Sequence, residues 1–209
     1  MRLIGGRWRR HRLPVADRPG LRPTPDRVRE TLFNWLGQDL TGWRCLDAFA
    51  GSGALGFEAA SRGAARVLLV ECDSDLAASL RAQAVRLGAE AVSVQCADGV
   101  ALLAGQGDET WDLVLLDPPY AAGLLQPSLE QAARGVAPGG FIYAESDRPL
   151  ASWPAGLALH RQLRAGAVFA HLLRRDEAPA RGAAGPDGDL EAQGATATLP
   201  APPRMGGLP

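Results

Sequence analysis

A glycine-rich segment near residue 50 is the first place where residue types and spacing point to chemistry. Residues 51–56 read Gly-Ser-Gly-Ala-Leu-Gly and come shortly after an apolar run. Glycines in this pattern, between a strand and a helix, let the backbone approach a nucleotide, and an acid about 20 positions later binds ribose hydroxyls. Glu71 stands at that distance from Gly51. A nicotinamide-dinucleotide site is therefore one open interpretation of the segment.

Asp47, four residues before Gly51, argues against a pyrophosphate at this loop. A carboxylate there repels phosphate and suits a ligand that carries an ammonium group. The pattern Asp47-x-Phe49-x-Gly51-x-Gly53 resembles the first motif of S-adenosylmethionine (SAM) methyltransferases. That resemblance implies that Glu71 binds the ribose and that Asp98 faces the adenine amine. SAM is thus the expected cofactor, without a metal, and the expected binding residues are Asp47, Phe49, Gly51, Gly53, Glu71 and Asp98.

A second motif, Asp117-Pro118-Pro119-Tyr120, follows an apolar run. It resembles the (Asp/Asn)-Pro-Pro-(Tyr/Phe) signature of methyltransferases that act on planar nitrogens, such as the exocyclic amines of bases. Such a nitrogen becomes more nucleophilic when the Asp117 carboxylate and the Pro118 carbonyl accept its N–H hydrogens. The prolines fix φ and remove backbone donors, and Tyr120 offers a face on which a flipped base can stack. We expect Asp117, Pro118 and Tyr120 to be the catalytic residues, and Asp at 117 favours a nucleobase over a protein amide.

Parallel strands would bring these residues to one edge. Short apolar runs alternate with helical stretches, a pattern typical of a parallel sheet with helices on both faces. The expected strands are 44–49, 66–71, 91–96, 111–117 and 140–145, and the expected helices are 53–62, 75–87, 98–104 and 125–135. Strands near 157–164 and 167–174, two residues apart, predict a hairpin. The expected fold class is α/β: a Rossmann-like SAM-dependent methyltransferase fold with a mostly parallel seven-stranded sheet and a terminal antiparallel hairpin.

The N-terminal region is basic, although the chain of 209 residues carries a net charge of −1. Residues 1–30 hold nine arginines and three acids, a balance of +6, which leaves −7 for the remainder. Residues 2–13 are expected to form a short two-stranded arm that turns at Gly5-Gly6, before a helix with Thr24 as N-cap and Pro25 at its first position. A basic arm favours RNA or DNA as partner. The expected contacts are Arg7, Arg9, Arg10, Arg12, Arg22, Arg27 and Arg29.

Three regions are expected along the chain. A basic arm (1–22) belongs to the same domain as a methyltransferase region (23–175). Ala, Gly and Pro make up 20 of the 34 residues of 176–209, which we expect to be a disordered tail because it has too little apolar surface to bury.

Other sequence features bear on location. No apolar run reaches the roughly 18 residues of a membrane span, and the N-terminal arginines precede no apolar signal segment. Cys45, Cys72 and Cys96 lack zinc or disulfide spacing. We therefore expect buried thiols, a cytoplasmic protein and no membrane contact.

Longer stretches are similar to one family. Residues 2–9 (RLIGGRWR), 21–36 (LRPTPDRVRETLFNWL), 49–56 (FAGSGALG) and 117–120 (DPPY) resemble the RsmD family of bacterial small-subunit ribosomal RNA methyltransferases. The resemblance covers about residues 2–175. It implies SAM-dependent methylation of the exocyclic N2 of one guanine, number 966 in the usual 16S rRNA numbering, during small-subunit assembly. 16S rRNA is the implied partner, and we expect a monomer.

Other functions stay open at this point. Adenine N6 methyltransferases, on RNA or DNA, share both motifs. An inactive SAM-fold protein that binds RNA as an assembly factor would share the fold. A nicotinamide oxidoreductase is the weakest alternative.

Overall fold

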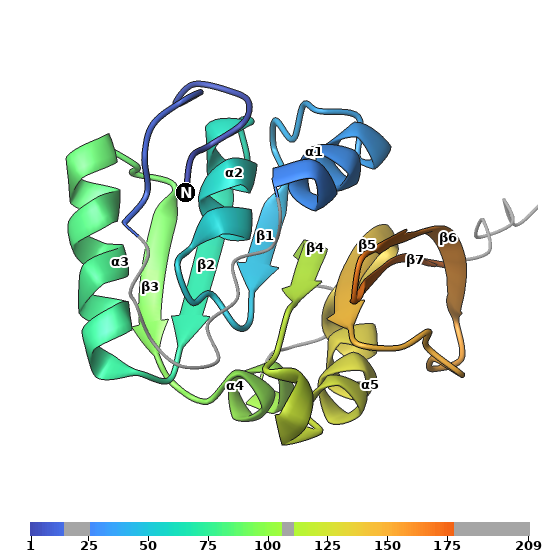
Figure 1. Ribbon diagram of the computed structural model, residues 1–209. Coiled ribbons are helices and arrows are strands. Elements are labelled where there is room, and N and C mark those ends of the chain that lie inside the picture. Colours follow the sequence, from blue (N-terminus) through green and yellow to red (C-terminus); the bar gives the residue numbers. More distant parts are fainter. Residues whose placement is uncertain (15–25, 106–110, 178–209) are drawn as a thin grey trace, which may run out of the picture. The chain divides into compact units, whose positions relative to one another are not determined.

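A seven-stranded sheet organises the computed structural model, which describes residues 1–14, 26–105 and 111–177 (Figure 1). The strand order is β3-β2-β1-β4-β5-β7-β6. Strands β1 to β5 run parallel, and β7 is antiparallel to both of its neighbours. The bounds are β1 Arg44–Asp47, β2 Arg66–Glu71, β3 Val92–Cys96, β4 Trp111–Leu116, β5 Val136–Ser146, β6 Leu157–Ala165 and β7 Val168–Arg175. The predicted α/β fold with a terminal hairpin is confirmed.

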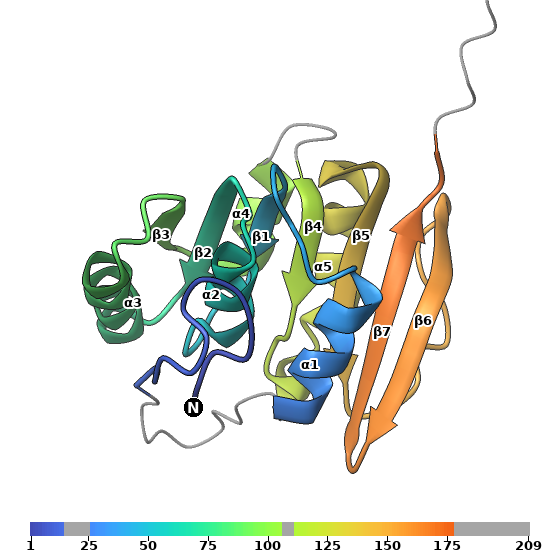
Figure 2. The same ribbon diagram turned by 90° about the horizontal axis from the view of Figure 1, so that it is seen from above.

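Helices cover both faces of this sheet (Figure 2). Helices α1, α2 and α3 contribute to the core on one face, and α4 and α5 to the core on the other. Their bounds are α1 Asp26–Trp35, α2 Ala54–Ser61, α3 Ser74–Leu87, α4 Gly99–Gly105 and α5 Leu125–Gly135. The predicted helices 53–62, 75–87, 98–104 and 125–135 agree with α2 to α5 to within one residue at each end.

Strand β4 shows why the central strands read as continuous apolar runs. Leu113 and Leu115 pack toward α1, α2 and α3, whereas Val114 and Leu116 pack toward α4 and α5. All four are 0% exposed. A parallel strand covered on both faces needs apolar residues at every position, because successive side chains point to opposite faces.

The N-terminal segment is part of the packed fold. Residues Arg2 and Arg12 form an antiparallel bridge, so the predicted two-stranded pairing occurs, but over one bridge only. Leu3 and Leu13 belong to the core on the α2 face. They help to cover α2, all of whose residues are buried. The segment therefore acts as a layer over that helix.

One other expectation is wrong in part, and two lie wholly or mostly outside the described residues. Cys45 is buried as expected, but Cys72 and Cys96 are exposed. Cys72 follows the end of β2, and Cys96 ends the edge strand β3, none of whose residues is buried. The caps assigned to Thr24 and Pro25 lie outside the described residues. Almost all of the tail 176–209 also lies outside the described residues, and its disorder and the domain boundaries at 22/23 and 175/176 stay predictions.

No helix in the described ranges combines the length and the apolar character that a bilayer span needs.

Candidate active site

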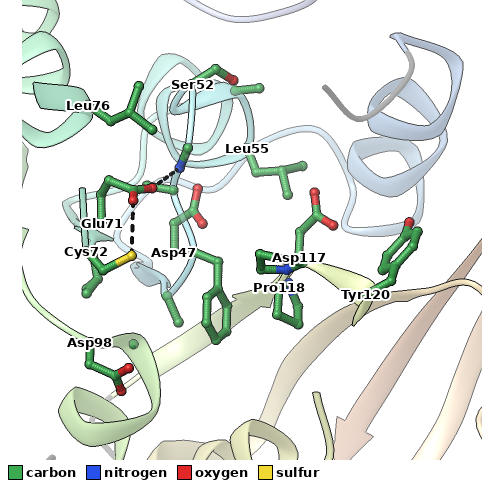
Figure 3. Close-up of a pocket in the computed structure, with 18 residues that line it drawn as sticks. Asp47, Ser52, Leu55, Glu71, Cys72, Leu76, Asp98, Asp117, Pro118 and Tyr120 are labelled. Carbon is green, nitrogen blue, oxygen red and sulfur yellow. Dashed lines mark hydrogen bonds between the residues drawn. The ribbon is translucent and has the colours of Figure 1, made fainter. Parts of the chain in front are cut away.

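One cavity of about 230 Å³ lies at the carboxyl edge of the parallel strands (Figure 3). It adjoins the point where the strand order changes direction, between β1 and β4, which is where open α/β sheets bind ligands. Asp47, Glu71, Asp98 and Asp117 all contribute to its lining. The four acids at the predicted strand ends, up to 70 positions apart in the sequence, therefore surround one space.

The glycine loop turns from β1 into α2 with backbone angles that suit glycine. Gly51 has a φ of 51° and Gly53 a φ of 76°, values that strain residues with a side chain. A Cβ on Gly53 would also lie 2.6 Å from the ring of Phe57. The Gly51 N–H donates a hydrogen bond of 2.8 Å to Glu71 Oε2. This bond ties the loop to the end of β2.

Asp47 is a buried carboxylate, 1% exposed, beneath that loop. Its Oδ2 accepts the N–H of Gly56 at 3.0 Å. Its Oδ1 has no hydrogen-bond partner within the described part of the chain. Burial raises the pKa of Asp47 to about 7, against the opposing effect of the backbone hydrogen bond from Gly56. An unsatisfied carboxylate oxygen in a cavity wall is suited to a cationic ligand.

Glu71 and Asp98 each hold backbone at a strand end. Glu71 Oε1 accepts the N–H of Asp73 at 2.9 Å, and Asp98 Oδ1 accepts the N–H of Ala101 at 2.7 Å in the first turn of α4. Carboxylate oxygens accept more than one hydrogen bond, so both residues retain acceptor capacity toward the cavity. Phe49 lines the same cavity and packs against the core beneath α4.

The Asp117–Tyr120 loop forms the opposite wall. Asp117 is partly buried at the end of β4, and Pro118 is buried beside it. Tyr120 begins the short 3-10 turn Tyr120–Ala122 and is 38% exposed. Figure 3 shows the Asp117 carboxylate and the Tyr120 ring on the same side of the loop. A carboxylate and an aromatic ring thus border the cavity together.

Sequence reasoning missed one acid, Glu145, near the end of β5. The apolar run 140–145 ends in this residue, so the same strand-end signal that singled out Asp117 was available. Glu145 is 2% exposed and accepts a hydrogen bond of 2.8 Å from the Tyr143 O–H. Burial, and then the Glu145 charge, raise the pKa of Tyr143 well above its ordinary value.

The predicted RNA-binding arginines have different environments. Arg7, Arg9, Arg10, Arg12 and Arg27 are exposed. The tip of the N-terminal segment is docked at the end of α2 farther from the glycine loop, because the Arg7 N–H donates to Ser61 O at 2.7 Å. Arg22 lies outside the described residues.

Arg29 is a correction to the predicted set, because it is 0% exposed. Its Nη2 donates to Asp26 Oδ1 at 2.6 Å and to the backbone oxygen of Arg2 at 2.9 Å. Its Nη1 lies 3.9 Å from Glu58 Oε2. These contacts join α1, α2 and the N-terminal segment, so Arg29 has a packing role and is not available to a phosphate.

Comparison with known proteins identifies relatives of this chain. Residues 1–174 match the family model described as Conserved hypothetical protein 95. The chain is 43% identical over 180 residues to Ribosomal RNA small subunit methyltransferase D of Escherichia coli, covering 84% of this chain and 90% of the relative. A Haemophilus influenzae protein of the same name is 38% identical over 175 residues, covering 80% and 90%.

A solved structure agrees with these sequence relatives. The structure of yhhF from Escherichia coli matches with a TM-score of 0.77 at 40% identity, covering 84% of this chain and 98% of the other. The chain therefore belongs to the RsmD family of methyltransferases.

Proposed function

We propose that this protein transfers a methyl group from SAM to the exocyclic N2 of a guanine in 16S ribosomal RNA. The observation that carries the proposal is the single cavity in which the Asp117–Tyr120 loop faces Asp47 and the glycine loop. The relatives named above supply the class of RNA. Guanine 966 is the target that the family resemblance implies. We infer that the protein acts as a cytoplasmic monomer on an assembling small subunit.

The residues at the glycine loop fit a cofactor with one cationic and one nucleoside end. Oδ1 of Asp47, which has no partner within the described chain, would accept a hydrogen bond from the ammonium of SAM. Glu71 would accept from the ribose hydroxyls, and Asp98 from the adenine amine. When bound, SAM supplies a methyl group that leaves its sulfur without the bonding electron pair, so the acceptor needs an available lone pair and must later lose one proton.

The Asp117–Tyr120 loop would prepare the acceptor nitrogen. The Asp117 carboxylate and the Pro118 carbonyl would accept the two N–H hydrogens of N2, which draws the lone pair out of the ring and directs it toward the methyl group. Tyr120 would stack on the guanine, an interaction worth about 1–3 kcal/mol for a base. Orientation of this kind accounts for a large part of the rate in two-substrate reactions.

The exposed arginines would hold the RNA. Arg7, Arg9, Arg10, Arg12 and Arg27 are accessible to phosphates, and Arg22 stays in the proposal on the sequence alone. Arg29 is removed from it because of its burial. Phosphate contacts position a nucleic acid without reading its sequence.

The decisive experiment uses labelled SAM and small ribosomal subunits that lack the modification, followed by digestion of the RNA to nucleosides. Label in N2-methylguanosine supports the proposal, and the position is then mapped. Label in N6-methyladenosine would support SAM as the methyl donor but would show that the target is adenine. SAM binding without transfer to subunits, naked RNA or DNA would favour an inactive RNA-binding protein.

A further inference from the structure

Asp117 and Glu145 occupy matching places on neighbouring strands. In the parallel pairing of β4 with β5, Leu115 lies opposite Tyr143 and Leu116 lies opposite Ala144. One step further along each strand come Asp117 and Glu145. Neighbouring strands are about 4.8 Å apart, so the two carboxylates start from adjacent backbone positions.

Both side chains leave the sheet on the same face. Side chains two positions apart share a face, so Asp117 follows Leu115 and Glu145 follows Tyr143, and both of these belong to the core beneath α1 and α2. The hydrogen bond from the Tyr143 O–H to Glu145 Oε1, 2.8 Å long, agrees with this placement. That bond also holds the Glu145 carboxylate in one orientation.

Glu145 lines a second cavity, which adjoins the Asp117–Tyr120 loop. This cavity has a volume of about 260 Å³ and shares Pro118, Pro119 and Tyr120 with the first one. Leu125 and Leu150 supply apolar walls, and Glu145 is a buried carboxylate among its lining residues. Of the two carboxylates in this lining, Glu145 is the buried one and Asp147 is exposed. A cavity with apolar walls and a buried carboxylate is suited to a planar ring with an N–H on its edge.

The edge of guanine offers such a group. Guanine carries a hydrogen on N1, next to the N2 amine, so two neighbouring acceptors on the protein can each take an N–H. Adenine has an unprotonated N1 next to its amine, and a carboxylate there would face a lone pair. Asp117 and Glu145 are two acceptors placed side by side.

We propose that the Glu145 carboxylate accepts the N1–H of the target guanine and so selects guanine over bases that have no hydrogen on N1. The inference rests on the proposed function and deepens it, because Asp117 and Pro118 then hold N2 while Glu145 reads the adjacent ring position. Sites built around a hydrogen bond discriminate strongly against a substrate that leaves their polar group unpaired.

The test compares two substrates in each of several enzyme variants. Small subunits are assembled with 16S rRNA that carries either guanosine or 2-aminopurine riboside at the mapped target. 2-Aminopurine keeps the 2-amine but has an unprotonated N1. We expect the native enzyme to prefer guanosine by about 100-fold in kcat/KM. In Glu145→Gln we expect this preference to fall to about 10-fold or less, because the amide N–H can pair with an unprotonated N1 and the amide oxygen can still accept from Tyr143.

Asp147→Asn is the matched control, since Asp147 is an exposed carboxylate that lines the same cavity. It should retain the native preference and the native affinity for SAM. Glu145→Asp keeps the buried charge but withdraws it by one methylene, so it replaces Glu145→Gln if that variant does not fold, and its preference should also fall.

Two results would overturn the inference while leaving the proposed function intact. One is a native enzyme that makes N2-methylguanosine yet methylates 2-aminopurine equally well. The other is a folded Glu145 variant that slows both substrates by the same factor and keeps the preference. A native enzyme that makes no N2-methylguanosine would remove the proposed function and this inference together.

Discussion

Asp117 is a partly buried carboxylate that directly follows β4, a strand whose last four residues are buried. It lines the same cavity as the glycine loop and the acids of β1 and β2, but it comes from the end of β4 and belongs to the opposite wall. Its proposed task, accepting hydrogens from the amine that is methylated, therefore belongs to the acceptor side of the site. Removing it should affect transfer and not cofactor binding.

For Asp117→Ala we expect the affinity for SAM to stay within about twofold of native, and kcat to fall by at least about 100-fold, as for a misplaced reacting group. Calorimetry gives the affinity, and release of labelled nucleosides gives kcat. Turnover near the native rate would show that another group prepares the amine. Comparing Asp117→Asn, which keeps one acceptor oxygen, would show how much depends on the charge.

Asp47 predicts a pH dependence of cofactor binding. Its pKa is raised from 3.8 to about 7, first because of burial. Below pH 7, Asp47 is mostly in its neutral acid form in the protein without SAM. The ammonium group of SAM must then displace the proton of that carboxyl group when it binds. We therefore expect the affinity for SAM to increase as the pH rises toward 7, by up to about tenfold per pH unit, and then to level off.

Binding of SAM to Asp47→Asn, measured by calorimetry from pH 5.5 to 7.5, is the check on this prediction. The variant should bind more weakly at pH 7 and should lose most of the pH dependence. An equal dependence in both proteins would assign the titration to another group.

At the scale of elements, α2 joins the N-terminal segment to the glycine loop. The carboxylate of Glu58 is 0% exposed and accepts the N–H groups of Ile4 and Gly5, both at 2.7 Å. Arg62 Nη2 pairs with the same carboxylate at 2.8 Å. The first turn of α2 follows the glycine loop directly. The arm is therefore held on the helix that also shapes the site.

Gly6→Ala tests how much this docking stabilises the fold. Gly6 has a φ of 69°, and a Cβ there would overlap the backbone oxygen of Ser61. The clash should displace the arm and expose Leu3 and Leu13, lowering the free energy of unfolding by roughly 2–4 kcal/mol. Gly42→Ala is the control, because its φ is 85° with nothing within 4 Å, so it should lose only about 1–2 kcal/mol. Equal losses in urea unfolding would mean that the arm adds little stability.

At the scale of the molecule, the arm tip that carries Arg7, Arg9 and Arg10 and the glycine loop lie at opposite ends of α2. Eight helical residues span about 12 Å, with the glycine loop before the first and the docked arm tip at the last. An RNA that reaches both must extend along this part of the surface. We therefore expect the arm to contribute to RNA affinity by charge and not to the transfer step.

Replacing Arg9 and Arg10 together by Ala should weaken RNA binding and make its salt dependence shallower. The slope of log K against log salt should decrease in magnitude by about 1–2, because each lost phosphate contact removes about 0.7–0.9. Filter binding between 50 and 200 mM salt would measure it. Arg134→Ala, an exposed arginine on α5 on the other face of the sheet, should leave the slope unchanged. An unchanged slope in the double variant would remove the arm from the RNA interface.

The strands, the helices after β1 and the acids Asp47, Glu71, Asp98 and Asp117 could be predicted because the signals are local. A buried parallel strand needs an unbroken apolar run, and the polar residue that ends it marks the ligand edge. Arg29 could not be predicted in this way, because its partners Arg2 and Glu58 lie 27 and 29 positions away. Arg29 lies off the apolar stripe of its helix, and such a position predicts an exposed side chain.

The amino-acid sequence alone is enough to predict the fold class and to single out the glycine loop and the Asp117–Tyr120 loop, because each of these signals depends on residues that are close together in the chain. Only the tertiary structure decides which distant groups share a space. It brings Glu145 beside Asp117 through strand register, and it turns a basic arm into a packed layer over α2 by burying Leu3 and Leu13. Burial and long-range pairing depend on contacts between segments far apart in the sequence. Local sequence patterns do not predict these contacts.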